Sequence, residues 1–292
     1  MAMDQLHRYL FRDADVRGEL VQLQQSFDEM IKDHDYPQII KQLLGELVAA
    51  TTLMTATLKF EGDIAVQLQS EGQIKYVVVN GTEKQKVRGI ARWDGEITET
   101  AFDKLFANGI LVITITPKQG ERYQGIVALD KSTLAECLEA YFQQSEQLPT
   151  KVVLHTQITQ NSVFAGGMLL QALPASDKDQ QLLQFEHLSQ LTDTISAQEL
   201  AELSAEDVLY RLYHQEDVEL YPAQDVEYNC GCSKQRSANA LTSVDKSELL
   251  DIVATQGAVV MNCQYCNARY EFDAVDIEAI HSGQYQEPGQ PQ

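Results

Sequence analysis

Two short motifs, Tyr228-Asn229-Cys230-Gly231-Cys232 and Asn262-Cys263-Gln264-Tyr265-Cys266, decide how the last part of this chain can fold. Thirty residues lie between Cys232 and Cys263. A C-x-C and a C-x-x-C together supply four thiolates, the ligand set of a closed tetrahedral zinc site. Gly231 makes the one-residue spacing feasible, because glycine adopts backbone angles that turn both neighbouring sulfurs toward one ion. We therefore predict one Zn²⁺ per chain, with four metal ligands: Cys230, Cys232, Cys263 and Cys266.

The second motif resembles a zinc knuckle. Val259-Val260-Met261 predicts an incoming strand and residues 268–272 predict a returning one. A purely structural zinc is one alternative to a redox-responsive site. A pair of structural disulfides is another, but it requires an oxidising compartment, which nothing in the sequence indicates.

Residues 230–292 are too few to bury a large core, so we expect the metal to decide whether this part folds. A structural zinc contributes about 10–16 kcal/mol in small zinc peptides, against about 5–15 kcal/mol for the stability of a whole domain. Coordinated thiolates are deprotonated and react with peroxide or hypochlorous acid, and a sulfenic acid formed on one has a second thiolate beside it. The short loops favour disulfides between neighbours, Cys230–Cys232 and Cys263–Cys266.

Composition limits the classes of function. The 292 residues carry a formal net charge of −21, which repels phosphate backbones and disfavours a nucleic-acid binder. The charged start of the sequence lacks the apolar core of a signal peptide, so we expect a soluble, cytoplasmic protein. Residues 43–58 are nearly all apolar, and we interpret them as part of a buried core helix that spans about residues 35–58, rather than as a membrane span.

Residues 1–176 predict a mixed α/β-sheet domain within an α+β fold. A capping box at Ser26 is expected to open a brief helix, and Ser132 to cap a helix that carries the buried thiol of Cys137. Asn80-Gly81 predicts a hairpin turn, and Gly166-Gly167 a β-bulge. Strands are expected at residues 7–11, 19–23, 64–69, 74–79, 87–93, 110–116, 123–129, 151–157 and 163–173.

Residues 177–229 predict an acidic helical linker. Between residues 177 and 227, thirteen acidic residues stand against two basic ones, which is about half of the net charge of the chain. Capping boxes at Ser196 and Ser204 indicate short helices. They could form an ordinary helical connector, or marginal helices that persist only while docked on the apolar face of the sheet. One stripe for such docking consists of Leu182, Phe185, Leu188 and Leu191.

Several stretches together resemble the thirty-three-kilodalton heat-shock protein family, the redox-regulated bacterial chaperonins. The resemblance runs through the whole chain, including the acidic middle and both cysteine motifs. It rests on Leu6-His7-Arg8-Tyr9-Leu10-Phe11, Thr57-Leu58-Lys59-Phe60-Glu61-Gly62, Tyr123-Gln124-Gly125-Ile126-Val127 and Ala165-Gly166-Gly167-Met168-Leu169-Leu170-Gln171.

This resemblance implies an ATP-independent holdase, inactive while reduced and zinc-bound. Oxidation combined with unfolding stress would expel zinc, pair the neighbouring cysteines, and melt residues 230–292 and then the linker at 177–229. Residues 1–176 would bind clients and form the dimer. The implied partners are unfolding client proteins, a second copy in the active homodimer, and ATP-dependent foldases that receive the clients.

Two further functions compete with the holdase. One is a constitutive, zinc-stabilised interaction protein without a redox role. The other is a thiol oxidoreductase that uses Cys263-Gln264-Tyr265-Cys266, but this motif lacks the strand-then-helix context typical of a redox-active C-x-x-C. No phosphate loop, nucleophile elbow or positioned acid–base pair is found in the sequence, so we expect no enzyme activity.

Overall fold

The computed structural model describes residues 3–57, 61–160 and 162–286. The chain divides into two compact units, Met1–Asn229 and Cys230–Gln292. The fold is α+β, as predicted. Position 58, at the predicted helix end, and residues 58–60 of one stretch that carries the family resemblance lie outside the described residues.

The first unit contains two six-stranded sheets. The first sheet has the order β10-β1-β2-β9-β8, and β11 also pairs with β1. Its strands are β1 (Gln5–Phe11), β2 (Val16–Leu23), β8 (Thr150–Ile158), β9 (Val163–Ala172), β10 (Val218–Leu220) and β11 (Gln224–Asp225). The second sheet has the order β12-β5-β4-β3-β6-β7. Its strands are β3 (Gly62–Gln69), β4 (Ile74–Thr82), β5 (Lys86–Trp93), β6 (Ile110–Pro117), β7 (Tyr123–Ala128) and β12 (Glu227–Tyr228).

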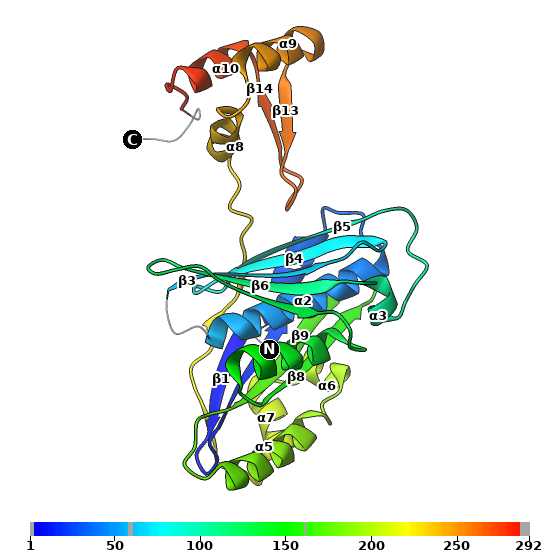
Figure 1. Cartoon of the computed structure of the whole chain (residues 1–292), viewed down its shortest axis with the longest axis vertical. Coiled ribbons are helices and arrows are strands. Elements are labelled where there is room, and N and C mark those ends of the chain that lie inside the picture. Colours follow the sequence, from blue (N-terminus) through cyan, green and yellow to red (C-terminus); the bar gives the residue numbers. More distant parts are fainter. Residues whose placement is uncertain (1–2, 58–60, 161, 287–292) are drawn as a thin grey trace. The chain divides into compact units, whose positions relative to one another are not determined.

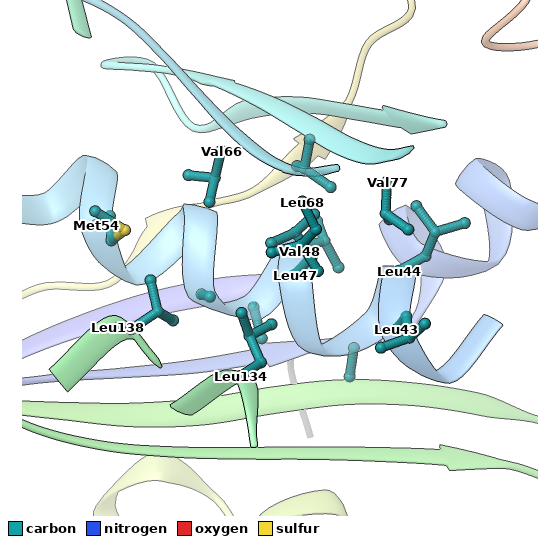
Figure 2. Packing of buried hydrophobic residues seen from close by; sticks show 14 of the residues in the cluster. Leu43, Leu44, Leu47, Val48, Met54, Val66, Leu68, Val77, Leu134 and Leu138 are labelled. Atoms are coloured by element: carbon teal, nitrogen blue, oxygen red, sulfur yellow. The ribbon is translucent and has the colours of Figure 1, made fainter. Parts of the chain in front are cut away.

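Helix α2 (Gln38–Thr57) lies between the two sheets and contacts both (Figure 1). Figure 2 shows its apolar side chains between Val66, Leu68 and Val77 on one side and two leucines of α4 (Leu134–Tyr141) on the other. The hydroxyl of Thr51 donates to the carbonyl of Leu47 at 2.7 Å, so this buried threonine is satisfied within the helix. Helix α2 is long and apolar enough to cross a membrane, but 72% of its apolar window is buried inside the protein. The prediction of a core helix is confirmed.

The predicted linker, residues 177–229, which we call the acidic segment, packs its helices on the other face of the first sheet (Figure 1). It forms α5 (Lys178–Thr192), α6 (Ala197–Glu202) and α7 (Ala205–Tyr213). Phe185 and Leu188 are buried in one cluster with Tyr9, Leu20 and other residues of that sheet. The expected docking of the stripe is therefore confirmed, with one exception. Leu182 remains 47% exposed, because it lies in the first turns of α5 at the edge of the contact.

Two predicted interruptions of strands are wrong. Asn80-Gly81 and Gly166-Gly167 both lie inside continuous ladders, with Gly81 opposite Ile64. A Cβ on Gly81 would lie 2.8 Å from a methyl carbon of Thr55 in α2, and one on Gly167 would lie 2.5 Å from the carbonyl oxygen of Val153. These glycines allow close packing rather than a change of chain direction.

Two predicted helix caps are also wrong. Helix α1 (Gln25–Ile31) has no cap from Ser26, since the carboxylate of Asp4 accepts the N–H groups of Gln25 at 2.9 Å and Ser26 at 2.7 Å. Helix α4 is capped by Thr133 rather than Ser132. The remaining helical elements of the first unit are α3 (Phe102–Leu105) and a π-helical turn, η1 (Phe142–Glu146).

The second unit is a small α+β body. Its helices are α8 (Lys234–Leu241), α9 (Lys246–Gln256) and α10 (Ala274–His281), and its hairpin consists of β13 (Val259–Asn262) and β14 (Arg269–Phe272). The predicted strands around the second motif are confirmed. The core of this unit is small, with the buried residues Ala238, Leu241, Leu249, Val259, Phe272, Ile277 and Ile280.

Candidate metal centre

The two cysteine motifs lie on short, tightly held segments of the second unit. Gly231 adopts a positive φ of 66°, which turns the chain between its two cysteine neighbours. Ser233 then caps α8 by accepting the N–H of Arg236 at 3.1 Å. The Arg236 guanidinium in turn donates to the carbonyl of Gly231. The first motif is therefore held on the chain that leads into α8.

The second motif occupies the turn of the β13–β14 hairpin. The N–H of Cys263 donates to the carbonyl of Ala268 at 2.8 Å, and the N–H of Asn267 donates to the carbonyl of Cys263 at 2.9 Å. Asn267 has a positive φ of 53°, a conformation that asparagine tolerates better than most residues. These bonds form a tight turn that points both cysteines of the motif to one side.

The structure brings all four predicted cysteines together. Their sulfurs lie within 4.8 Å of one another. The sulfur of Cys230 lies 3.3 Å from that of Cys263, and the sulfur of Cys232 lies 3.4 Å from that of Cys266. None of the four thiols forms a disulfide, and all four are half-buried. Tetrahedral zinc with Zn–S bonds of about 2.3 Å separates its sulfurs by about 3.8 Å, so this all-sulfur donor set fits a zinc ion after small adjustments.

Tyr270 on β14 contacts this cluster and was not predicted from the sequence. Its hydroxyl lies 3.0 Å from the sulfur of Cys232. This hydrogen bond raises the pKa of Tyr270, so the hydroxyl remains protonated and can donate to the sulfur. The sequence feature that could have revealed it is the two-residue alternation of β14, which puts Tyr270 on the same face as the buried Phe272.

The pKa values of three thiols, Cys230, Cys263 and Cys266, shift in different directions. Partial burial, followed by hydrogen bonding to Cys263, raises the pKa of Cys230. Burial also raises the pKa of Cys266. For Cys263, burial disfavours the thiolate, but hydrogen bonds from Cys230 and from the backbone N–H groups of Tyr265 and Cys266 outweigh it and lower the pKa. The hydrogen bonds around Cys263 therefore favour its thiolate.

Cys137 lies outside the cluster. It is fully buried on α4 in the first unit, as predicted for a core thiol. Burial raises its pKa, which keeps the thiol protonated and poorly nucleophilic.

Comparison with known proteins links the chain and its four-cysteine cluster to a known family. The family model described as Hsp33 protein matches residues 4–273, a range that includes all four clustered cysteines.

The chain belongs to the Hsp33 family.

Its similarity to Hsp33 relatives extends over nearly the whole sequence. The chain is 60% identical to the 33 kDa chaperonin of Pseudoalteromonas atlantica, over 98% of this chain and 97% of that protein. It is 51% identical to the 33 kDa chaperonin of Serratia proteamaculans, with 96% of each chain covered. The crystal structure of the 33 kDa chaperonin (Hsp33) of Thermotoga maritima superimposes with a TM-score of 0.82 at 23% identity, covering 96% of this chain and 99% of that one. That structure supports the fold, and the Hsp33 family supports a chaperone function.

Proposed function

We propose that this protein is a redox-regulated, ATP-independent chaperone that holds unfolding proteins and prevents their irreversible aggregation. Family membership supports the chaperone role, and the four sulfurs within 4.8 Å of one another support the redox role. The proposed division of labour is that residues 1–176 bind clients and form the dimer, 177–229 act as a releasable linker, and 230–292 form the switch. The proposed location is the cytoplasm, where thiols stay reduced.

In the reduced state, Cys230, Cys232, Cys263 and Cys266 would hold one Zn²⁺. The ion would supply cross-links between the C-x-C segment and the hairpin turn, and it would keep the thiolates deprotonated. Few residues form the core of this unit, so its folding depends on these cross-links.

Oxidation would begin when one thiolate attacks peroxide, which gives a sulfenic acid and releases hydroxide. A neighbouring thiolate then attacks the sulfenic sulfur, forms a disulfide and releases a second hydroxide. Each disulfide removes two ligands. The proposed pairs are Cys230–Cys232 and Cys263–Cys266, and once both form, no thiolate remains to hold the metal.

Loss of the second unit would then release the acidic segment. The Asn229 N–H donates to the carbonyl of Val87 at 2.9 Å, so this segment is held on the second sheet up to the residue before Cys230. Two of its helices, α6 and α7, have only six and nine residues and therefore depend on docking. Undocking would uncover the apolar face around Tyr9 and Leu20. Unfolding clients would bind there, an active homodimer would form, and ATP-dependent foldases would later accept the clients.

One experiment tests this function directly. Zinc content, free thiols and suppression of client aggregation are measured on the same samples before and after treatment with peroxide under mild unfolding stress. Before treatment we expect one zinc per chain and no suppression of aggregation. After treatment we expect the zinc to be lost and client aggregation to be suppressed. Equal suppression in both states would instead indicate a constitutive zinc-stabilised interaction protein. A Cys137→Ala variant is the control, because its thiol lies outside the cluster and should not alter zinc content.

A further inference from the structure

The end of the acidic segment pairs with part of one edge of each sheet. Strands β10 and β11 pair with β1 at the edge of the first sheet, and β12 pairs in parallel with β5 at the edge of the second. All three strands lie between residues 217 and 229, which we call the edge segment. Residues 217–229 thus pass as one continuous stretch from the first sheet to the second and run directly into Cys230.

The edge segment is attached mainly through its backbone. At β1, the N–H of Tyr221 donates to the backbone carbonyl of Arg8 at 2.9 Å, and the N–H of Arg12 donates to the backbone carbonyl of Asp217 at 2.9 Å. At the second sheet, the N–H of Glu227 donates to the carbonyl of Gln85 at 3.0 Å, next to the bond between Asn229 and Val87. These bonds are strand-like and do not depend on which side chains the segment carries.

The attachment is also short. Strand β10 has three residues, and β11 and β12 have two each. The ion pairs at the same edges, from Arg12 to Glu219 and from Lys86 to Glu227, involve exposed side chains and are screened by water. The buried Val226 and the half-buried Tyr228 pack against the core between the sheets. The half-buried Val218 and Leu220 of β10 pack against the cluster on the other face of the first sheet. Strands of this length stay paired only while the chain on both sides is held.

Release of the edge segment would leave β1 and β5 with unpaired N–H and C=O groups. Such edges are templates for an added strand from another chain. Strand addition takes its binding energy from the main chain, so it accepts many sequences. That property suits a chaperone whose clients share nothing except an unfolded backbone.

We propose that the edges of β1 and β5 are concealed binding sites for extended segments of unfolded polypeptide, and that the edge segment occupies them until the second unit unfolds. The inference rests on the proposed chaperone function, and it adds a binding mode to the apolar face described above. The apolar face would hold client side chains, while the two edges would hold client backbone in the register that β10, β11 and β12 vacate.

A pair of peptides tests the proposal. A synthetic peptide of residues 216–229 should compete with client for the oxidised protein and restore client aggregation. The second peptide has the same sequence except for Tyr221→Pro and Asn229→Pro. These changes remove one N–H donor to each sheet while preserving length and charge. We expect the native peptide to compete strongly and the proline peptide to compete several-fold less. Equal competition by both peptides, or none by either, would overturn the proposal.

Hydrogen exchange provides a second measurement on the intact chain. The amide of Arg12 bonds to the edge segment, so it should be protected in the reduced protein, exchange quickly after oxidation, and become protected again when client binds. Binding to the apolar face alone would leave this amide exchanging quickly. Strand β7 forms the opposite edge of the second sheet and pairs with no part of the edge segment, so its exchange should not follow oxidation. If the oxidised protein does not suppress aggregation at all, the proposed function itself fails, whereas suppression without protection of Arg12 refutes only strand addition.

Discussion

The sulfur of Cys232 lies 3.0 Å from the phenolic oxygen of Tyr270, so a strand residue outside both cysteine motifs contacts the candidate metal centre. A hydrogen bond to a thiolate withdraws charge from the sulfur and fixes its orientation. Groups that contact metal ligands in this way tune both metal affinity and ligand reactivity.

Replacing Tyr270 with phenylalanine removes this hydroxyl and little else. We expect Tyr270→Phe to weaken zinc binding by about tenfold or more and to accelerate the loss of free thiols in peroxide. Competition with a zinc chelator and a thiol assay measure the two effects. Tyr210→Phe is the control, since Tyr210 is 73% exposed on α7 and lies in the other unit. Unchanged zinc affinity and oxidation rate in Tyr270→Phe would show that the hydroxyl does not influence the site.

The disulfides that form on oxidation show which factor decides the pairing, the length of the loop between two cysteines or the distance between their sulfurs in the folded unit. The sulfur of Cys230 lies 3.3 Å from that of Cys263, which is 33 residues away along the chain. Every pair must still approach to about 2.05 Å to bond. We expect Cys230–Cys232 and Cys263–Cys266 nonetheless, because the unit loosens as ligands are lost and short loops then close at lower entropic cost. Peptide mapping of the oxidised protein decides this. Cys230–Cys263 as the main product would show that proximity in the folded unit controls the chemistry.

Docking of the acidic segment can be weakened without touching the cysteines. Phe185 is 8% exposed, whereas Leu183 on the same helix is 69% exposed. We expect Phe185→Asp to destabilise docking by about 3 kcal/mol or more, through loss of aromatic burial and introduction of a charge into an apolar cluster. Aggregation assays on the reduced, zinc-loaded variant should then show chaperone activity. Leu183→Asp adds the same charge without uncovering the face, and it should remain inactive. Activity in both variants would point to charge alone.

A buried carboxyl group should make the first unit sensitive to pH. Glu19 on β2 is 2% exposed, and burial raises its pKa to about 7, opposed by Arg17 and Arg8. The folded state therefore binds this proton more tightly than the unfolded state, and its contribution to stability, about 3 kcal/mol, is lost as the pH rises from about 4.5 to about 7.

The Glu19→Gln variant should remove this dependence. We expect its melting temperature to exceed that of the wild type at about pH 8, with the gap closing at about pH 5. The single tryptophan, Trp93 on β5, reports unfolding of this unit by fluorescence. Asp63→Asn on β3 is an exposed control and should shift the melting temperature little at either pH. A constant gap between Glu19→Gln and wild type would indicate that Glu19 is charged throughout.

The sequence predicted features that depend on neighbours along the chain. Two-residue alternation located the longer strands, and the cysteine spacing identified the four residues that the structure brings together. Prediction from the sequence failed where a contact with a residue far away along the chain determines the local structure. The cap of α1 comes from Asp4, more than twenty residues before the helix. Gly81 is explained by a methyl group on α2 rather than by a turn.

The short edge strands could not be predicted from the sequence either, for a different reason. Strands β11 and β12 have two residues each, too few for any periodic pattern, and their positions follow from the edges that they meet. Tyr270 alternates correctly on β14, but its contact with Cys232 required the hairpin and the C-x-C segment to be placed in space.

The pairing of β1 with β10 also has a consequence for synthesis on the ribosome. Arg12 and Glu219, which form an ion pair beside this ladder, are 207 residues apart. At translation rates of about 5–20 residues per second, β1 waits roughly 10–40 s before its edge partner has been made. During that interval every newly made copy has an open β1 edge, whatever its redox state. The growing chain therefore exposes an unpaired strand edge, a template for strand addition, until residue 219 has been made.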